Sequence, residues 1–290
     1  MYQLLILLCV AFSVFRREMP KLPYDLKKAE LKLTLPLILQ EISGITILDS
    51  TTIACVQDEN GILFLYDFKK ASIKRQITFS INGDYEGITK VNQTLYILRS
   101  DGVIFEIADY TASKLIVKEY KTGIPAINNE GLCYDATNKR LLIGAKGKIN
   151  KDPGYKNQRF IYEFNLATKM LNQKPLFNFN TIEVNLLAKM NGVEFKKHKN
   201  KKGEVHEIGL KFNTSEIAIH PITKELYILS ANDHCLFICS SKGELVHIEQ
   251  LSPITFNKAE GLSFFPNGDV LISNEGQAHQ PTLLKFNYKP

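Results

Sequence analysis

Short runs of alternating apolar and polar residues, separated by polar turns, fill the chain from about residue 28 onward. Runs such as ILFLY (62–66) and FIYEF (160–164) show this alternation, which is typical of half-buried strands. A short helix is predicted near residues 182–189. The pattern therefore predicts an all-β protein built from many short antiparallel strands.

One motif recurs along the chain and divides it into units of similar length. Its copies are ISGI (42–45), YEGI (85–88), NEGL (129–132), SEIA (215–218) and AEGL (259–262). Their third positions are residues 44, 87, 131, 217 and 261, so the spacings are 43, 44, 86 and 44. Further predicted strands follow each copy. Four strands in each repeat of this length are the pattern of one blade of a β-propeller.

The repeats account for five blades in a single propeller domain. The fifth repeat holds only three predicted strands, whereas an alternating run, KAELKLTL (28–35), precedes the first motif. We expect this N-terminal strand to complete the last blade, because that pairing closes the ring and removes two open sheet edges. The interval 181–212 has poor strand patterning. We interpret it as an excursion with a short helix and a lysine-rich loop; a degraded sixth blade is the alternative.

The first residues differ from the rest of the chain. Residues 2–15 carry no charge and are followed by Arg16, Arg17 and Glu18. This apolar stretch is short for a bilayer span and suits a secretory signal, whereas the two arginines after it fit a membrane anchor. We assign 1–23 to a signal peptide or membrane anchor and 24–290 to the propeller. We expect a periplasmic or cell-membrane-associated protein that contacts the membrane only through this segment.

Charge and cysteine content narrow the class of protein further. The net charge is +6, and five lysines between residues 196 and 202 supply +5 of it. A nucleic-acid binder would carry a basic face built into its fold, so we expect no nucleic-acid partner. The cysteines number five, and an odd number argues against a disulfide framework. We expect a monomer.

Propeller topology brings the recurring polar residues to one face. The loops that enter each innermost strand lie on the same face as the loops that join the second and third strands. The predicted metal ligands are the motif glutamates, with Ser43 in the remaining place: Glu86, Glu130, Glu216 and Glu260. The predicted ligand-binding residues form a surrounding set: Asp58, Glu59, Arg99, Lys146, Asp233 and Glu275. Crowded carboxylates repel one another, and Ca²⁺ is the cation that suits them best. The alternative is that these carboxylates cap strands and turns.

With these motifs, residues 24–290 resemble the SdiA-regulated (YjiK-like) family of bacterial envelope propellers. The resemblance is carried by ISGI (42–45), DYEGI (84–88), NEGL (129–132), KAEGL (258–262) and NGDVLISNE (267–275). It implies a propeller, an exported or membrane-associated location and calcium binding at the Glu-rich face, without a defined reaction. The chain departs from the family pattern at Ile217, which replaces glycine, and in the excursion at 181–212.

Two classes of function fit these residues. One is a calcium-binding ligand or scaffold protein that holds a small or extracellular ligand at its acidic face. The other is a calcium-dependent hydrolase, phytase-like or lactonase-like, in which the metal polarises a phosphate or ester and Arg99 and Lys146 hold the anionic group. The sequence has no Gly-x-Ser-x-Gly elbow, P-loop or His-Glu-x-x-His motif. We therefore favour binding and assign no catalytic residue.

Overall fold

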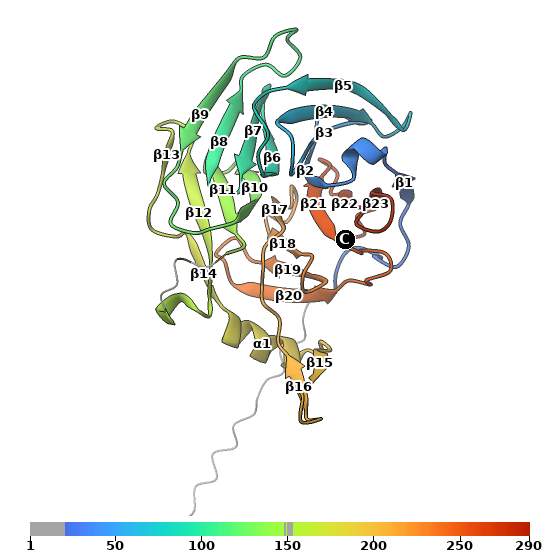
Figure 1. Cartoon of the computed structure of the whole chain (residues 1–290), viewed down its shortest axis with the longest axis vertical. Coiled ribbons are helices and arrows are strands. Elements are labelled where there is room, and N and C mark those ends of the chain that lie inside the picture. Colours follow the sequence, from blue (N-terminus) through green and yellow to red (C-terminus); the bar gives the residue numbers. More distant parts are fainter. Residues whose placement is uncertain (1–20, 148, 150–152) are drawn as a thin grey trace, which may run out of the picture.

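A computed structural model describes residues 21–147, 149 and 153–290. Residues 1–20, which hold most of the predicted signal peptide or anchor, lie outside the described part of the chain. The described residues form a five-bladed β-propeller, which confirms the predicted fold class (Figure 1). Within this part of the chain, no helix is both long and apolar enough to cross a membrane.

Each blade is an antiparallel sheet, and in the first four blades the strands follow one another in sequence from the axis outward. The first blade comprises β2 (Ile42–Ile47), β3 (Thr52–Gln57), β4 (Ile62–Asp67) and β5 (Ser72–Thr78). The second comprises β6 (Tyr85–Val91), β7 (Thr94–Arg99), β8 (Val103–Ile107) and β9 (Val117–Lys121). The third comprises β10 (Asn129–Asp135), β11 (Arg140–Ala145), β12 (Gln158–Asn165) and β13 (Met170–Leu171), and β14 (Phe177–Asn180) also pairs with β12. The fourth comprises β17 (Glu216–Ile219), β18 (Leu226–Ser230), β19 (Cys235–Cys239) and β20 (Leu245–Gln250).

The fifth blade joins the two ends of the described chain, as predicted. It comprises β21 (Ala259–Phe264), β22 (Val270–Asn274), β23 (Thr282–Phe286) and β1 (Leu31–Thr34). β1 runs antiparallel to β23 from the pair Leu31–Lys285 to the pair Thr34–Thr282. The ring is therefore closed by backbone hydrogen bonds. Two short 3₁₀ helices, Leu37–Leu39 and Pro153–Tyr155, lie in the connections.

The core is divided among the seams between blades. Five clusters of buried apolar side chains each combine residues of two neighbouring blades. Four cysteines, Cys55, Cys133, Cys235 and Cys239, are buried there without disulfide bonds. Because each seam buries side chains of two sheets, each blade stabilises its neighbours.

The excursion at 181–212 forms no blade, so the six-blade alternative is wrong. It contains the predicted helix, α1 (Thr181–Met190), and then two strands, β15 (Lys196–Lys199) and β16 (Val205–Ile208). The prediction of a lysine-rich loop is corrected here, because β15 and β16 pair as an antiparallel hairpin. All eight of its strand residues are exposed, so no core-facing alternation marked them as strands. Figure 1 shows α1, β15 and β16 together at one end of the molecule, below β20.

Candidate functional site

The Glu of the recurring motif is the extra residue of a β-bulge in three blades. In the second blade Tyr85 pairs with Arg99 and Gly87 pairs with Leu98, so Glu86 has no partner on β7. The same irregularity occurs at Glu130 on β10 and at Glu260 on β21. A bulge interrupts the alternation of a strand and re-aims one side chain. The repeated Glu-Gly pair therefore directs three carboxyl groups out of the regular ladders where the innermost strands begin.

The glycine of the motif allows the innermost strands to approach closely. A Cβ placed on Gly87 would lie 2.7 Å from Leu132 Cβ and 2.8 Å from the backbone oxygen of Glu130. A Cβ on Gly44 would lie 2.8 Å from the backbone oxygen of Glu86. Each of these glycines thus faces the bulge of the next blade, and the glutamates are brought together by this tight packing.

The fourth blade departs from the pattern where Ile217 replaces glycine. Glu216 pairs regularly with Leu229, and Ile217 with Ile228, so there is no bulge. The Glu216 carboxylate accepts hydrogen bonds from the backbone N–H groups of Leu132, at 2.8 Å, and of Ile217, at 2.9 Å. Burial raises the pKa of Glu216 well above its usual value despite these amides. Glu216 is therefore a buried link between the third and fourth blades.

The bulged glutamates belong to a larger group of charged side chains, which we call the carboxyl cluster: Glu41, Asp58, Asp84, Glu86, Glu130, Glu260 and Glu275, with Lys146 and Lys258. Lys146 Nζ lies 2.6 Å from Glu130 Oε1. Lys258 Nζ lies 3.5 Å from Glu260 Oε1 and also pairs with Glu275. The seven carboxyl groups thus share two ammonium groups.

Two pairs of carboxyl groups in this cluster lie close enough to share a proton, Glu86 with Asp84 and Glu41 with Glu275, and this proximity raises the pKa of Glu86 and of Glu41. A hydrogen bond between two carboxyl groups requires a proton on one of them. The two lysines only partly offset the repulsion among the carboxylates of the cluster, so some of its carboxyl groups stay protonated.

The pKa values of the cluster follow from burial and like charge. Burial, with the charges of Glu130 and Asp84, raises the pKa of Glu86 to about 10. Burial and Glu260 raise the pKa of Glu130 to about 8, against the opposing effect of Lys146. Burial opposes the charge on Lys146, but Glu130 and Glu260 outweigh it and hold the pKa of this lysine above its usual value. Around neutral pH, Glu86 is thus protonated and Lys146 is charged.

Two members of the carboxyl cluster, Glu41 and Asp58, have pKa values close to neutral pH. The hydrogen bond to Glu275, followed by burial, raises the pKa of Glu41 to about 7. Burial and the charge of Glu41 raise the pKa of Asp58 to about 6. These two groups therefore change protonation state in the range where most enzymes and binding proteins operate.

The predicted site residues divide into two groups. The cluster contains Glu86, Glu130, Glu260, Asp58, Lys146 and Glu275, and Glu216 lies close enough for the charges of Glu130 and Glu260 to act on it. Glu59 is exposed. Arg99 instead pairs with Asp101 at 2.9 Å. The Asp233 carboxylate accepts bonds from the N–H groups of Lys211 and Phe212 and anchors the end of the excursion.

Sequence reasoning missed Glu41, Asp84 and Lys258 as members of the cluster. All three occupy the same position in their repeats, two residues before Ser43, Glu86 and Glu260. A charged residue at this position in three repeats was visible in the sequence. Its charge is negative in two repeats and positive in the third, however, so the position does not resemble a set of metal ligands.

The fit of the cluster to a metal ion is mixed. Among the described residues, no group of three or more His, Cys, Asp or Glu side chains is arranged to hold a metal ion. The buried oxygens Glu130 Oε2, Glu216 Oε2 and Asp58 Oδ1 nevertheless have no hydrogen-bond partner, and hard oxygens of this kind are ligands of Ca²⁺. The lysines supply part of the positive charge that an ion would bring, so binding would have to rearrange a Lys–Glu pair or displace a proton.

The pH dependence of stability tests the protonation of Glu86. A carboxyl whose pKa is 4.5 in the unfolded chain and about 10 in the fold contributes stability that is complete below the lower value and is lost as pH rises through the higher one. Gln at this position cannot ionise. We expect Glu86→Gln to melt less pH-dependently than the wild type between pH 6 and 10, and to be more stable at pH 9 by about 3 °C. Glu119→Gln, an exposed change on β9, should leave the profile unaltered, and parallel profiles for wild type and Glu86→Gln would show that Glu86 is ionised.

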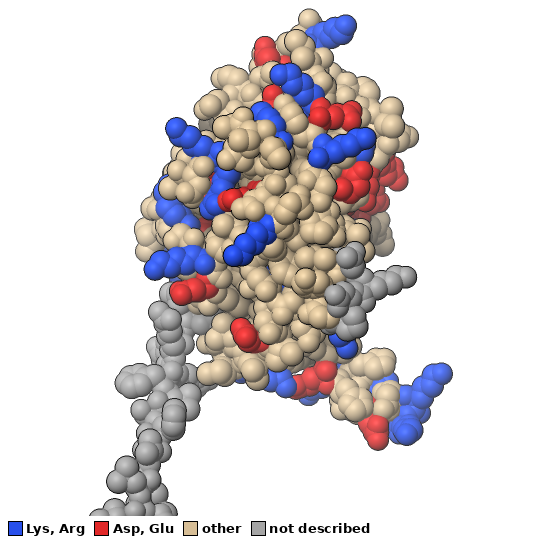
Figure 2. Space-filling model, turned by 90° about the vertical axis from the view of Figure 1, so that its left-hand side faces the viewer, with Lys and Arg blue, Asp and Glu red and all other residues tan. Residues whose placement is uncertain are grey.

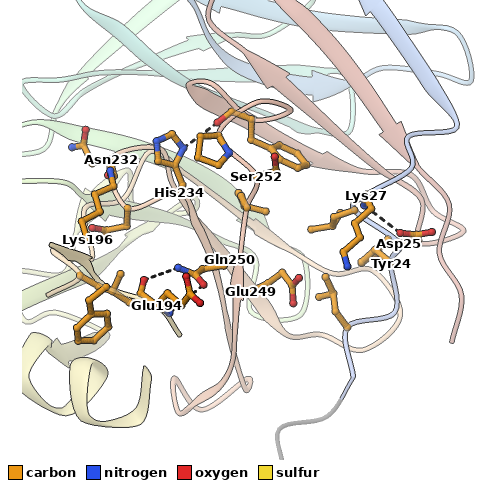
Figure 3. A pocket seen from close by; sticks show the side chains of 18 of the residues that line it. Tyr24, Asp25, Lys27, Glu194, Lys196, Asn232, His234, Glu249, Gln250 and Ser252 are labelled. Carbon is orange, nitrogen blue, oxygen red and sulfur yellow. Dashed lines mark hydrogen bonds between the residues drawn. The ribbon is translucent and has the colours of Figure 1, made fainter. Parts of the chain in front are cut away.

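A separate groove of about 1310 Å³ lies between the excursion and the seam of the fourth and fifth blades. Figure 3 shows Glu194 and Lys196 on one side of it and Tyr24 and Lys27 on the other. Gln250 clamps the excursion to β20, because its side chain donates to the carbonyl of Glu194 at 2.7 Å and accepts from the N–H of the same residue at 3.2 Å. Of the predicted site residues, Asp233 alone lines this groove.

Comparisons with known proteins support the fold. No family model and no curated protein matches the chain. Among solved structures, Myxococcus xanthus glutaminyl cyclase matches with a TM-score of 0.58 and 12% identity, over 90% of this chain and 96% of that one. A streptogramin B lyase structure matches with a TM-score of 0.47 and 12% identity, over 89% and 97% of the two chains. At this identity the first likeness shows a shared propeller fold and no more.

Proposed function

We propose that the protein is a ligand-binding propeller of the cell envelope, whose carboxyl cluster takes up a cationic group. One observation carries this proposal: bulges in three blades bring the buried Glu130 and Glu260 together with the half-buried Glu86, and Glu130 Oε2 has no hydrogen-bond partner there. A buried carboxylate oxygen without a partner is costly in the free protein, and a cation offsets that cost. The envelope location rests on the apolar stretch at 2–15.

Calcium is the first candidate for that cation. Glu86, Glu130 and Glu260, with Glu216 beside them, would hold it. Carboxylate oxygens are its preferred ligands, and when bound it supplies positive charge to the carboxyl cluster. A small organic cation with an ammonium group is the other ligand class that the same charges favour. Both would compete with the Lys146–Glu130 ion pair and with the proton on Glu86.

Calcium should raise the melting temperature of the wild type if it binds in this cluster. At a hundredfold excess over the dissociation constant, the gain in unfolding free energy is about 2.7 kcal/mol. Glu130→Gln keeps the shape of the side chain but cannot ionise, so we expect a smaller calcium shift. In EDTA at pH 9, above the pKa of about 8 for Glu130, the same variant should be as stable as the wild type or more stable, because repulsion between carboxylates is relieved.

Melting temperatures of both proteins, each in EDTA and in millimolar calcium, provide the measurement. Glu59→Gln is the matched control, since that side chain is exposed, and it should keep the full calcium shift. A variant that is less stable in both buffers, together with a wild type that does not respond to calcium, would identify Glu130 as a structural residue.

A hydrolase is the second candidate, and the near-neutral pKa values favour it. Glu41 at about 7 and Asp58 at about 6 suit general acid–base catalysis at neutral pH. Lys146 and Lys258, which pair with carboxylates of the cluster, supply its positive charge for a phosphate or ester, and Arg99 pairs with Asp101 outside the cluster. Phosphomonoester, phytate and lactone hydrolysis should be assayed with and without calcium. An N-terminal glutaminyl peptide belongs in the same screen, with fold alone as its justification.

A further inference from the structure

The excursion at 181–212, which we call the arm, exposes apolar side chains on both of its elements. Ile182 is 54% exposed and Leu186 59% exposed on α1, and Val205 is 62% exposed and Ile208 44% exposed on β16. Residues four apart lie on the same face of a helix, so Ile182 and Leu186 form one apolar stripe. Exposed apolar groups gathered in this way mark an interaction surface.

This stripe is distinct from the face that holds α1 on the propeller. Val184 and Ala188 are buried in the seam between the third and fourth blades. Asn185 receives a hydrogen bond from the N–H of Leu210 at 2.7 Å and donates to its carbonyl at 3.0 Å. The arm is thus fixed on the body by one face of α1, while its apolar stripe points away from the core.

The hairpin lies beside the stripe and carries a net positive charge. Lys189 Nζ lies 2.8 Å from Glu207 Oε2 and joins α1 to β16. Lys189 contacts the hairpin and Asn185 contacts Leu210, which follows it. Around the helix, these two residues lie next to Ile182 and Leu186. Five lysines and two glutamates occur between residues 196 and 208, which gives a net charge of +3 from these side chains. Figure 2 shows Lys side chains gathered on the segment that projects at the lower right, where the hairpin lies.

The arm also lies close to the N-terminal end of the described chain. Lys21 and Leu22 line the same groove as Phe195, Lys196 and Ile208. Twenty residues precede Lys21, and they include the uncharged stretch at 2–15. A membrane that holds this stretch would therefore be within reach of the arm.

We propose that the arm binds bilayers that contain anionic phospholipids. The stripe and Val205 would enter the interface between headgroups and acyl chains, as the apolar faces of surface-bound helices do. The lysines of the hairpin would lie among the phosphates, where each basic residue strengthens binding to an anionic surface. This extends the membrane contact beyond the N-terminal segment and orients the propeller with the arm toward the bilayer.

Vesicle flotation of the full-length chain tests this proposal, with vesicles of phosphatidylcholine alone or with 30% phosphatidylglycerol. Residues 1–20 contribute equally to every variant, so the readout is the ratio of the partition coefficients for anionic and neutral vesicles. K199E/K201E/K202E should lower this ratio about a hundredfold, and 0.5 M salt should lower it for the wild type. K114E/K118E/K121E, on the outer edge of the second blade, changes the net charge equally and should retain the wild-type ratio. Leu186→Ser should weaken binding to anionic vesicles and leave its salt dependence unchanged.

Three results would overturn the proposal. The first is a wild type with equal partition into both kinds of vesicle. The second is a loss in the control triple variant as large as in the arm variant, since net charge alone would then explain binding. The third is retention of the wild type on DNA without any preference for anionic vesicles, which would assign the lysines to a nucleic acid. Circular dichroism of each variant confirms that the propeller is folded.

Discussion

A chain that lacks residues 1–35 is expected to melt at least 10 °C below the full-length protein. The deletion removes β1, which pairs with β23 along its whole length, and the buried side chains of Tyr24, Leu26 and Leu35. Burial of an apolar side chain of this size contributes about 2 kcal/mol. The loss is therefore more than about 5 kcal/mol, and in a protein of this size each kcal/mol lowers the melting temperature by about 2 to 4 °C.

Deletion of residues 1–20 is the matched control, because it leaves β1 and its buried neighbours in place. That variant should melt like the full-length protein. The longer deletion also exposes the edge of β23, so it should aggregate more readily on heating. If both truncated chains melt at the same temperature as the full-length chain, closure by β1 does not stabilise the ring.

Gly87→Ala is expected to destabilise the protein by about 3 kcal/mol, at the upper end of what overpacking a core costs. The new methyl group would lie 2.7 Å from Leu132 Cβ and 2.8 Å from the backbone oxygen of Glu130. Neither atom is the end of a flexible side chain, so the second and third blades must move apart. The shift would also displace Glu130, and the effect of calcium on melting should weaken in parallel.

Gly123→Ala separates the effect of contact from that of backbone strain. Gly123 has a φ of +64° and no atom within 4 Å of an added Cβ, so alanine there brings strain alone, about 1 kcal/mol. Denaturant unfolding of both variants measures the difference. An equal loss at the two positions would mean that the innermost strands adjust to the methyl group and that close approach is not the role of the motif glycine.

The propeller could be predicted because its motif recurs at a regular spacing. The copies at 85–88, 129–132 and 259–262 each form a bulge followed by a glycine that packs closely against the next blade. Every blade with this geometry needs the same residue types, so the motif repeats. The closing strand was predictable because a strand period and a missing partner pointed to the same segment. The hairpin of the arm was not, since exposed strands such as Lys196–Lys199 need no apolar alternation and resemble a loop.

The candidate site was predictable in its members more than in its chemistry. The bulged glutamates were identified from the motif, but the pairing of Lys258 with Glu260 and Glu275 depends on the ends of different strands meeting in space. Asp233 shows the converse: its spacing in the repeat is that of a site residue, and the carboxylate is bound by the N–H groups of Lys211 and Phe212. Which acids gather and which are occupied by backbone amides is decided by tertiary contacts.

The closure of the ring also determines when folding can finish. The hydroxyl of Tyr24 donates to the carbonyl of Gly268, 244 positions later in the chain. The partner of β1 is likewise β23, which is synthesised near the end of the chain. Ribosomes add about 5 to 20 residues per second, so synthesis of 290 residues takes about 15 to 60 s. Throughout that time the first strand made has no partner, and contacts so distant in sequence form slowly even afterwards.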